Sequence, residues 1–183
     1  LSFFLIGNLR LKDVNIISSF NEGALIKIIS SKVEINRFYN LDNEEDIINQ
    51  LIDLSNPEKD VPTIFIWPEG VITSTYLKDI SKYKDLFKVF SNKHLIIIGV
   101  NDLVLDKENK IHNSLALFDN QLNLKSLYYK NKLVPFGEFL PLESLLNKIG
   151  LRSVAYNYQS FSRGTNRDTI KIKNNSFNLN ILP

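Results

Sequence analysis

A carboxylate stands at the predicted end of a short buried strand, where a site could form. Residues 63–67 (TIFIW) are too short and too β-branched for a helix and are predicted to form that strand. Pro68 cannot donate to a β-ladder and ends the strand, so Glu69 falls at the rim of the sheet, where open α/β sheets place their sites. Gly70 then lets the chain turn away. Taken alone, this segment also fits an ordinary strand–turn–helix in which Glu69 is solvated or caps a helix.

A second segment places an amine and another carboxylate in similar surroundings. Lys130 stands at the end of a later predicted strand, and Glu138 lies in the loop that follows it. Pro135, Gly137 and Pro141 give this loop a fixed, irregular conformation. A charge that only aids solubility would be oddly placed between a glycine and a phenylalanine. The alternative interpretations are a solvated lysine at a strand end and a glutamate that serves as an ion-pair partner.

The composition is that of a globular chain without a thiol. The 183 residues are 44% hydrophobic and 23% charged, and the formal net charge of +2 is too small to indicate a nucleic-acid partner. The absence of cysteine excludes disulfides, thiolate metal sites and a thiol nucleophile within this sequence. His94 and His112 lack metal-ligand spacing and are expected at the surface or at strand edges. No stretch reaches the roughly 18–20 apolar residues of a membrane span.

The elements that must position these side chains alternate between strand and helix, which is the pattern of an α/β domain. Residues 24–30 are predicted as a core strand, residues 42–55 as a helix with acids in its first turn, and residues 94–100 as a buried strand. Residues 77–92 are predicted as a second helix whose inward residues are Ile80, Tyr83, Leu86, Phe87 and Phe90. Residues 111–118 and 122–129 are predicted to form a hairpin.

Three ordered blocks resemble one protein family. Residues 67–70 (WPEG) resemble the glutamate motif of the nitrilase superfamily. Residues 128–141 (YYKNKLVPFGEFLP) resemble the lysine motif as it occurs in apolipoprotein N-acyltransferases, and residues 160–164 (SFSRG) resemble a further block of that family. One such block alone would carry little weight, whereas three in order are a specific signal.

The resemblance implies a fold and a reaction. The fold would be the nitrilase-like α-β-β-α sandwich, with a Glu-Lys-Cys triad. By motif, Glu69 would be the general base, Lys130 the cation that stabilises the oxyanion, and Glu138 a second glutamate that supports the site. The enzymes of this family move an acyl chain from a phospholipid, through a Cys thioester, to the N-terminal amine of a diacylglyceryl-cysteine lipoprotein. This chemistry requires no metal or organic cofactor.

The sequence also departs from the family. The Cys block is expected after residues 177–183, and a multi-span membrane domain is expected before Leu1; neither is present in the sequence. We therefore expect residues 1–23 to be a linker or the tail of a membrane helix. Residues 24–183 would be a partial catalytic domain, the first half of the sandwich, which is inactive alone.

The implied setting is the bacterial inner membrane, with the catalytic domain facing the periplasm. The implied partners are a phospholipid acyl donor and a lipoprotein N-terminus, with no nucleic acid. Two alternatives stay open. One is a soluble amidase of the same superfamily, against which LVPFGEFLP and SFSRG argue. The other is a non-catalytic interaction module that has kept the fold and lost the thiol.

Overall fold

A computed structural model of the chain describes residues 25–30, 44–105, 109–141, 160–165, 169–173 and 178–181. The elements are β1 (Leu25–Ile28), α2 (Glu44–Ser55), β2 (Thr63–Ile66), β3 (Ile72–Tyr76), the 3-10 helices η3 (Leu77–Tyr83) and η4 (Leu86–Val89), β4 (His94–Val104), β5 (Lys110–Asp119), β6 (Leu124–Tyr129), β7 (Ile170–Lys173) and β8 (Asn178–Ile181). The linker predicted for residues 1–23 lies outside the described residues and stays a prediction.

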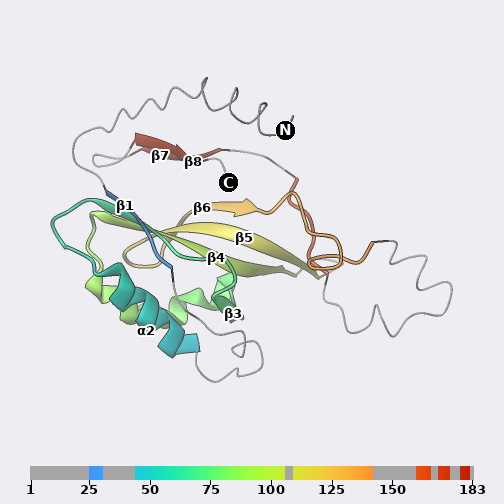
Figure 1. Cartoon of the computed structure of the whole chain (residues 1–183), viewed down its shortest axis with the longest axis horizontal. Coiled ribbons are helices and arrows are strands. Elements are labelled where there is room, and N and C mark those ends of the chain that lie inside the picture. The colour runs from blue at the N-terminus through green and yellow to red at the C-terminus, as the bar shows by residue number, and fades with distance from the viewer. Residues whose placement is uncertain are drawn as a thin grey trace, which may run out of the picture.

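A mixed six-stranded sheet forms the centre of the fold. Its strands lie in the order β1-β2-β4-β5-β6, and β3 pairs with β4 at Val100 and Asn101. The strands β1, β2 and β4 run parallel, whereas β4, β5 and β6 are joined as an antiparallel meander. Parallel neighbours need crossover connections, and α2 and the 3-10 helices provide them on one face of the sheet (Figure 1). The predicted α/β class is therefore confirmed.

The main core lies between the sheet and these helices. Trp67, Phe65 and Phe87 are among its largest fully buried side chains. From α2 it takes Ile48, Leu51 and Ile52, and from β4 it takes Ile96 and Ile98. The helix predicted at residues 42–55 is confirmed with a slightly later start, and its acidic first turn suits the positive end of the helix dipole.

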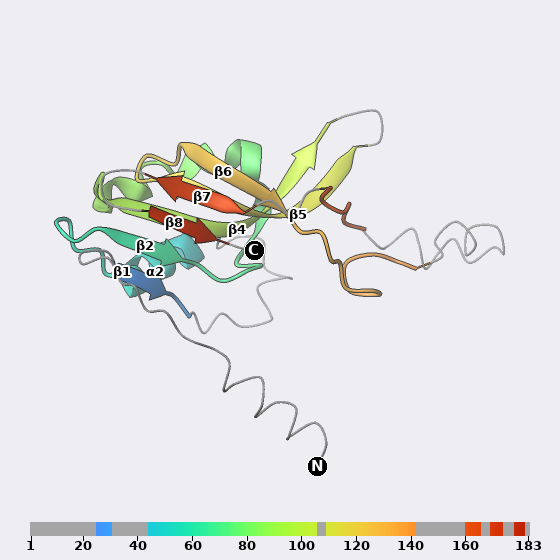
Figure 2. The same cartoon turned by 90° about the horizontal axis from the view of Figure 1, so that it is seen from above.

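The opposite face of the sheet packs against a small second sheet. The strands β7 and β8 pair in antiparallel fashion and lie across this face (Figure 2). Ile170 and Ile172 of β7 pack there with Ile64, Leu95, Ile97 and Leu117. The layers therefore follow the order helix, sheet, sheet, as the resemblance implies. The strand β8 lies within residues 177–183, after which the Cys block is expected, whereas β7 was not predicted.

The single helix predicted for residues 77–92 is wrong. Two 3-10 helices, η3 and η4, occupy this segment. Leu77, Ile80, Tyr83 and Leu86 are spaced by three residues, and residues three apart lie on the same side of a 3-10 helix. Ile80 and Tyr83 are buried and Leu86 is half-buried, so the predicted inward positions are largely correct although the helix type is not.

The core strand predicted in residues 24–30 is a strand, but it lies at the edge of the sheet. Among the described strands β1 pairs with β2 alone. Leu25, Ile26 and Ile28 are 46%, 53% and 77% exposed, whereas Ile29 is buried. A short apolar run has the same pattern in a central and an edge strand, so its pattern could not distinguish the two positions.

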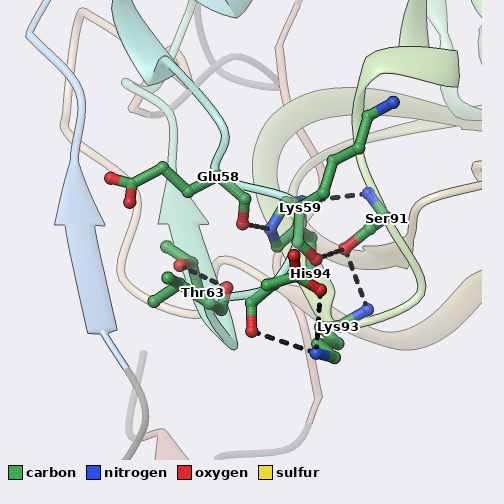
Figure 3. Close-up of polar contacts among 8 residues, drawn as sticks. Glu58, Lys59, Thr63, Ser91, Lys93 and His94 are labelled. Carbon is green, nitrogen blue, oxygen red and sulfur yellow. Dashed lines mark hydrogen bonds and ion pairs between the residues drawn. The ribbon is translucent and has the colours of Figure 1, made fainter.

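Both histidines are buried, which corrects their predicted exposure. Nδ1 of His94 accepts from Ser91 N at 3.0 Å, so Nε2 carries the proton and donates to Glu58 O at 2.9 Å (Figure 3). His112 stacks on Tyr129 with ring centroids 4.3 Å apart. Each ring is thus part of the packing, and no metal-ligand cluster is found in the described part of the chain.

Candidate active site

Glu69 is held at the rim of the sheet by the backbone on either side of it. Trp67 N donates to Ile97 O at 2.9 Å, the last such bond before the chain leaves the sheet. Gly70 has a φ of +68°, a conformation that favours glycine and turns the chain away. A Cβ at Gly99 of β4 would lie 3.0 Å from Glu69 Cα, so the glycine allows the glutamate backbone to approach β4 closely. The position predicted for Glu69 is correct.

Lys130 follows β6 and contacts both predicted glutamates. Its backbone N donates to Asn113 O at 2.9 Å, which continues the β5–β6 ladder. Its Nζ lies 3.1 Å from Glu69 Oε1 and 2.8 Å from Glu138 Oε1. Glu69 and Lys130 are 61 residues apart in sequence. The structure thus brings together all three residues that the sequence analysis singled out.

Glu138 is fixed by the loop in which it lies. Its backbone N donates to Val134 O, and its Oε2 accepts from Val134 N, both at 2.8 Å. Phe136 adopts a φ of +61°, which is uncommon for a residue with a side chain, and Phe136 N donates to Phe139 O at 2.8 Å. The carboxylate therefore closes its own loop with one oxygen and meets Lys130 with the other.

Residues 160–165, here called the strap, run along the backbone of this site. Three strap N–H groups donate to main-chain oxygens: Phe161 N to Glu138 O, Ser162 N to Ile111 O, and Gly164 N to Lys130 O, at 2.7–3.0 Å. The SFSRG motif in this segment resembles a block of the family, but a motif alone does not place it in the fold. The strap holds the backbones of Lys130 and Glu138, whose side chains meet in the site.

Asn113 is the site residue that sequence reasoning missed. It lies in β5, and its Nδ2 is 2.5 Å from Glu69 Oε1 and 3.1 Å from Glu138 Oε1. Its sequence signal is weak: asparagine is depleted in strands, and Asn113 interrupts an otherwise strand-forming run. Its backbone O also accepts the bond from Lys130 N, so Asn113 contacts all three charged residues.

The ionised forms of Lys130 and Glu138 stabilise each other. Burial alone would lower the pKa of Lys130, but hydrogen bonds to Glu138 and Glu69 outweigh burial and raise it. Burial alone would raise the pKa of Glu138, but hydrogen bonds from Lys130, Val134 N and Asn113 lower it. The side chain of Glu69 is 60% exposed, against 14% for Glu138. Glu69 is thus the acid that an incoming molecule can reach.

The arrangement can support acyl transfer by a nucleophile placed beside it. An exposed carboxylate can accept a proton, and a fixed ammonium can stabilise a developing oxyanion. No helix among the described residues is long and apolar enough to cross a membrane. Fold and site together describe an α/β protein whose Glu-Lys-Glu cluster lies at a sheet rim.

The chain is similar in sequence to part of several curated proteins. The chain is similar to apolipoprotein N-acyltransferases: 36% identical over 117 residues to that of Wigglesworthia glossinidia brevipalpis, 29% over 115 residues to that of Sinorhizobium fredii, and 24% over 161 residues to that of Rhodopseudomonas palustris. The matches cover 60%, 61% and 81% of this chain. They cover 21%, 22% and 30% of the relatives, so the chain spans less than a third of their length. The resemblance described from the motifs is thus confirmed.

Solved structures with partial similarity include an N-terminal amidase and an NAD+ synthetase. An N-terminal amidase bound to an Asn-Glu-Ala peptide is 21% identical, with a TM-score of 0.38 over 60% of this chain and 28% of that one. The glutamine-dependent NAD+ synthetase of Acinetobacter baumannii is 14% identical, with a TM-score of 0.43 over 76% of this chain and 24% of that one. No protein-family model matches the chain.

Proposed function

We propose that this chain supplies the glutamate and lysine part of an apolipoprotein N-acyltransferase site. Glu69 is the general base, Lys130 stabilises the oxyanion, and Glu138 holds Lys130 in place. The observation that carries the proposal is the contact of Lys130 Nζ with both glutamates, at 3.1 and 2.8 Å. The sequence similarity to enzymes of that name supports it.

The proposed chemistry has two steps and requires a thiol. In the first, Glu69 takes the thiol proton, the thiolate attacks a phospholipid ester, a C–S bond forms and the C–O bond breaks. The proton then goes to the departing alkoxide. In the second, the lipoprotein amine attacks the thioester, a C–N bond forms, the C–S bond breaks, and the amine proton reaches the thiolate through Glu69. Lys130 stabilises the oxyanion in both steps. The 183 residues contain no cysteine, so the thiol must be supplied from outside this sequence.

The proposal includes a setting and two partners. The acyl donor is a phospholipid, the acceptor is the N-terminal amine of a diacylglyceryl-cysteine lipoprotein, and the reaction takes place at the periplasmic side of the bacterial inner membrane. On this proposal the 183 residues alone form no acyl adduct when they are incubated with phospholipid. Detection of a stable adduct by mass spectrometry would contradict that part of the proposal.

A chimera tests the assignment of the residues. In the Wigglesworthia enzyme, the segment that corresponds to residues 63–165 of this chain is replaced by those residues, and the rest is left unchanged. We expect the chimera to move a labelled acyl chain from phospholipid to a diacylglyceryl-cysteine peptide. Glu69→Gln and Lys130→Met should each lower the transfer rate by about 100-fold or more.

Matched substitutions elsewhere serve as controls. Glu58→Gln and Lys125→Met remove the same charges at exposed positions outside the cluster and should leave transfer unchanged. A folded chimera that transfers no acyl chain, or one that stays fully active without Glu69 or Lys130, would contradict the proposal. Hydrolysis of small amides without acyl transfer would favour a soluble amidase instead.

A further inference from the structure

Asn113 and Lys130 bind the same two carboxylate oxygens. Nδ2 of Asn113 lies 2.5 Å from Glu69 Oε1 and 3.1 Å from Glu138 Oε1. Nζ of Lys130 lies 3.1 and 2.8 Å from the same two atoms. A side-chain amide nitrogen carries two protons, so one can go to each carboxylate. The four side chains therefore form a closed ring in which two donors alternate with two acceptors.

The charges explain why a neutral donor is needed in this ring. Two ionised glutamates and one ammonium leave a net charge of −1 in the cluster, and each carboxylate disfavours the ionisation of the other. The hydrogen bond from Asn113 helps to lower the pKa of Glu138, and Asn113 also donates to Glu69, without adding a further charge. The opposite orientation of the amide would turn its carbonyl oxygen toward two carboxylates, which electrostatic repulsion disfavours.

The backbone of Asn113 fixes its side chain in this position. Asn113 pairs with Asn101 of β4, and its O accepts from Lys130 N at 2.9 Å. The hydroxyl of the next residue, Ser114, donates to Val100 O. The residue is thus held from both neighbouring strands and has little freedom to follow a glutamate that moves.

We infer that Asn113 is a positioning residue that holds Oε1 of Glu69 and Oε1 of Glu138 together and leaves Oε2 of Glu69 as the atom that takes a proton. Glu69 is 60% exposed, and its Oε2 accepts no hydrogen bond from the described residues. The catalytic meaning of this inference rests on the proposed function. The shared hydrogen bonds can be tested without turnover.

The first test uses the unsubstituted 183-residue chain. We expect both side-chain amide protons of Asn113 to shift in NMR spectra as the glutamates are protonated with falling pH. Glu69→Gln should abolish the pH response of one proton, and Glu138→Gln that of the other. Amide protons that show no response in the acidic range would overturn the inference.

The second test removes both side-chain N–H donors of Asn113. Asn113→Leu keeps a side chain of similar size, and the ¹³C-detected titration midpoint of Glu138 should rise, because its carboxylate loses a hydrogen bond that favours the ionised form. Asn120→Leu is the matched control, because Asn120 follows β5 at its other end and donates to Phe90 O at 3.4 Å. An unchanged Glu138 midpoint in folded Asn113→Leu would overturn the inference. If the variant does not fold, the first test decides.

The two proposals can fail separately. An inactive chimera combined with responsive Asn113 protons would refute the acyl-transfer assignment and leave the shared hydrogen bonds established. An active chimera combined with unresponsive Asn113 protons would refute the role of Asn113 and leave the function intact.

Discussion

At the scale of individual residues, the charge of Glu138 depends on its hydrogen bonds. Its carboxylate accepts from Lys130 Nζ, Asn113 Nδ2 and Val134 N, and these bonds hold its pKa below the ordinary value despite burial. Because the pKa is lower in the folded than in the unfolded chain, the stabilisation is present above the unfolded-state pKa. It is lost as the pH falls through the folded-state pKa.

Glu138→Gln should therefore destabilise the chain at neutral pH and much less in acid. We expect the free energy of unfolding to fall by about 1–2 kcal/mol at pH 7. Below the folded-state pKa of Glu138 the difference should vanish, because the native carboxylate is then also neutral. Urea unfolding at both pH values measures this, with exposed Glu58→Gln as the control. An equal loss at both pH values would contradict the explanation.

The sequence marks some site residues locally and leaves others unmarked. Glu69 and Lys130 could be predicted because each follows a recognisable strand, and Glu138 because prolines and glycines surround it. Asn113 could not be predicted, because its two partners are 44 and 25 residues away and meet it only when β2, β5 and β6 are assembled. Strand pairing at long range leaves no mark in the spacing of residues.

At the level of elements, one buried carboxylate joins α2 to β3 and η3. Glu44, in the first turn of α2, accepts from Ser74 N at 2.8 Å, from Thr75 N at 3.3 Å and from Tyr83 OH at 2.8 Å. The Thr75 hydroxyl also donates to it. Since β3 begins shortly after Glu69, this contact also fixes the segment that leaves the site.

Glu44→Gln should destabilise the chain by about 2 kcal/mol, because the amide nitrogen cannot accept the bonds that one carboxylate oxygen now receives. Glu45→Gln is the matched control: Glu45 is adjacent, lies in the same helix turn and is exposed. Chemical unfolding of both variants measures the difference. Equal stabilities would show that Glu44 does not join these elements.

The strap depends on a glycine. A Cβ at Gly164 would lie 2.2 Å from Tyr129 O, and a main-chain atom in a paired strand cannot move away cheaply. Gly164→Ala should therefore detach the strap, lower stability by about 1–3 kcal/mol and speed hydrogen exchange at the Gly164 position. In Gly137→Ala the new Cβ would lie 3.4 Å from a methyl of Val134, so this variant should be milder. Unchanged exchange in Gly164→Ala would contradict this account.

Element types were predicted where the period of the apolar residues is clear. The helical period of residues 44–55 identifies α2, because it repeats over three turns. The three-residue spacing of Leu77, Ile80 and Tyr83 fits both an α-helix and a 3-10 helix. Pattern alone therefore located the buried positions of η3 without fixing its hydrogen bonds.

At the level of the whole molecule, His94 joins the start of central strand β4 to the loop before β2. Burial lowers the pKa of His94 despite its hydrogen bond to Glu58 O, so the neutral ring is favoured in the folded chain. Stability is then fully present above the unfolded-state pKa, which is about 6.5. It is lost as the pH falls from there toward the folded-state pKa.

Thermal unfolding between pH 7 and pH 5 tests this contribution. The melting temperature of the unsubstituted chain should fall with pH in this range, and His94→Gln should flatten that dependence. His94→Gln should also be less stable at pH 7, because the ring contacts Phe65 and Phe90 edge-on at 5.3 and 5.9 Å. A slope that is unchanged by the substitution would assign the acid sensitivity to other groups.

The order of the layers could be predicted from the sequence, whereas the strand at the edge of the sheet could not. Alternating strands and helices indicated the α/β class, and the motifs indicated the sandwich order that α2, the main sheet and β7–β8 follow. The edge position of β1 could not be predicted, because position in a sheet depends on which strand comes next to it. The relatives share only part of their length with this chain.

The strap has a consequence for protein redesign. Its bonds to Glu138, Ile111 and Lys130 join main-chain atoms, which every amino acid except proline can provide at the donor positions. A library that randomises positions 161 and 162 should therefore return many tolerated residues, whereas position 164 should return glycine alone. The geometry of the charged cluster can thus be kept while residues 161 and 162 of the strap are substituted.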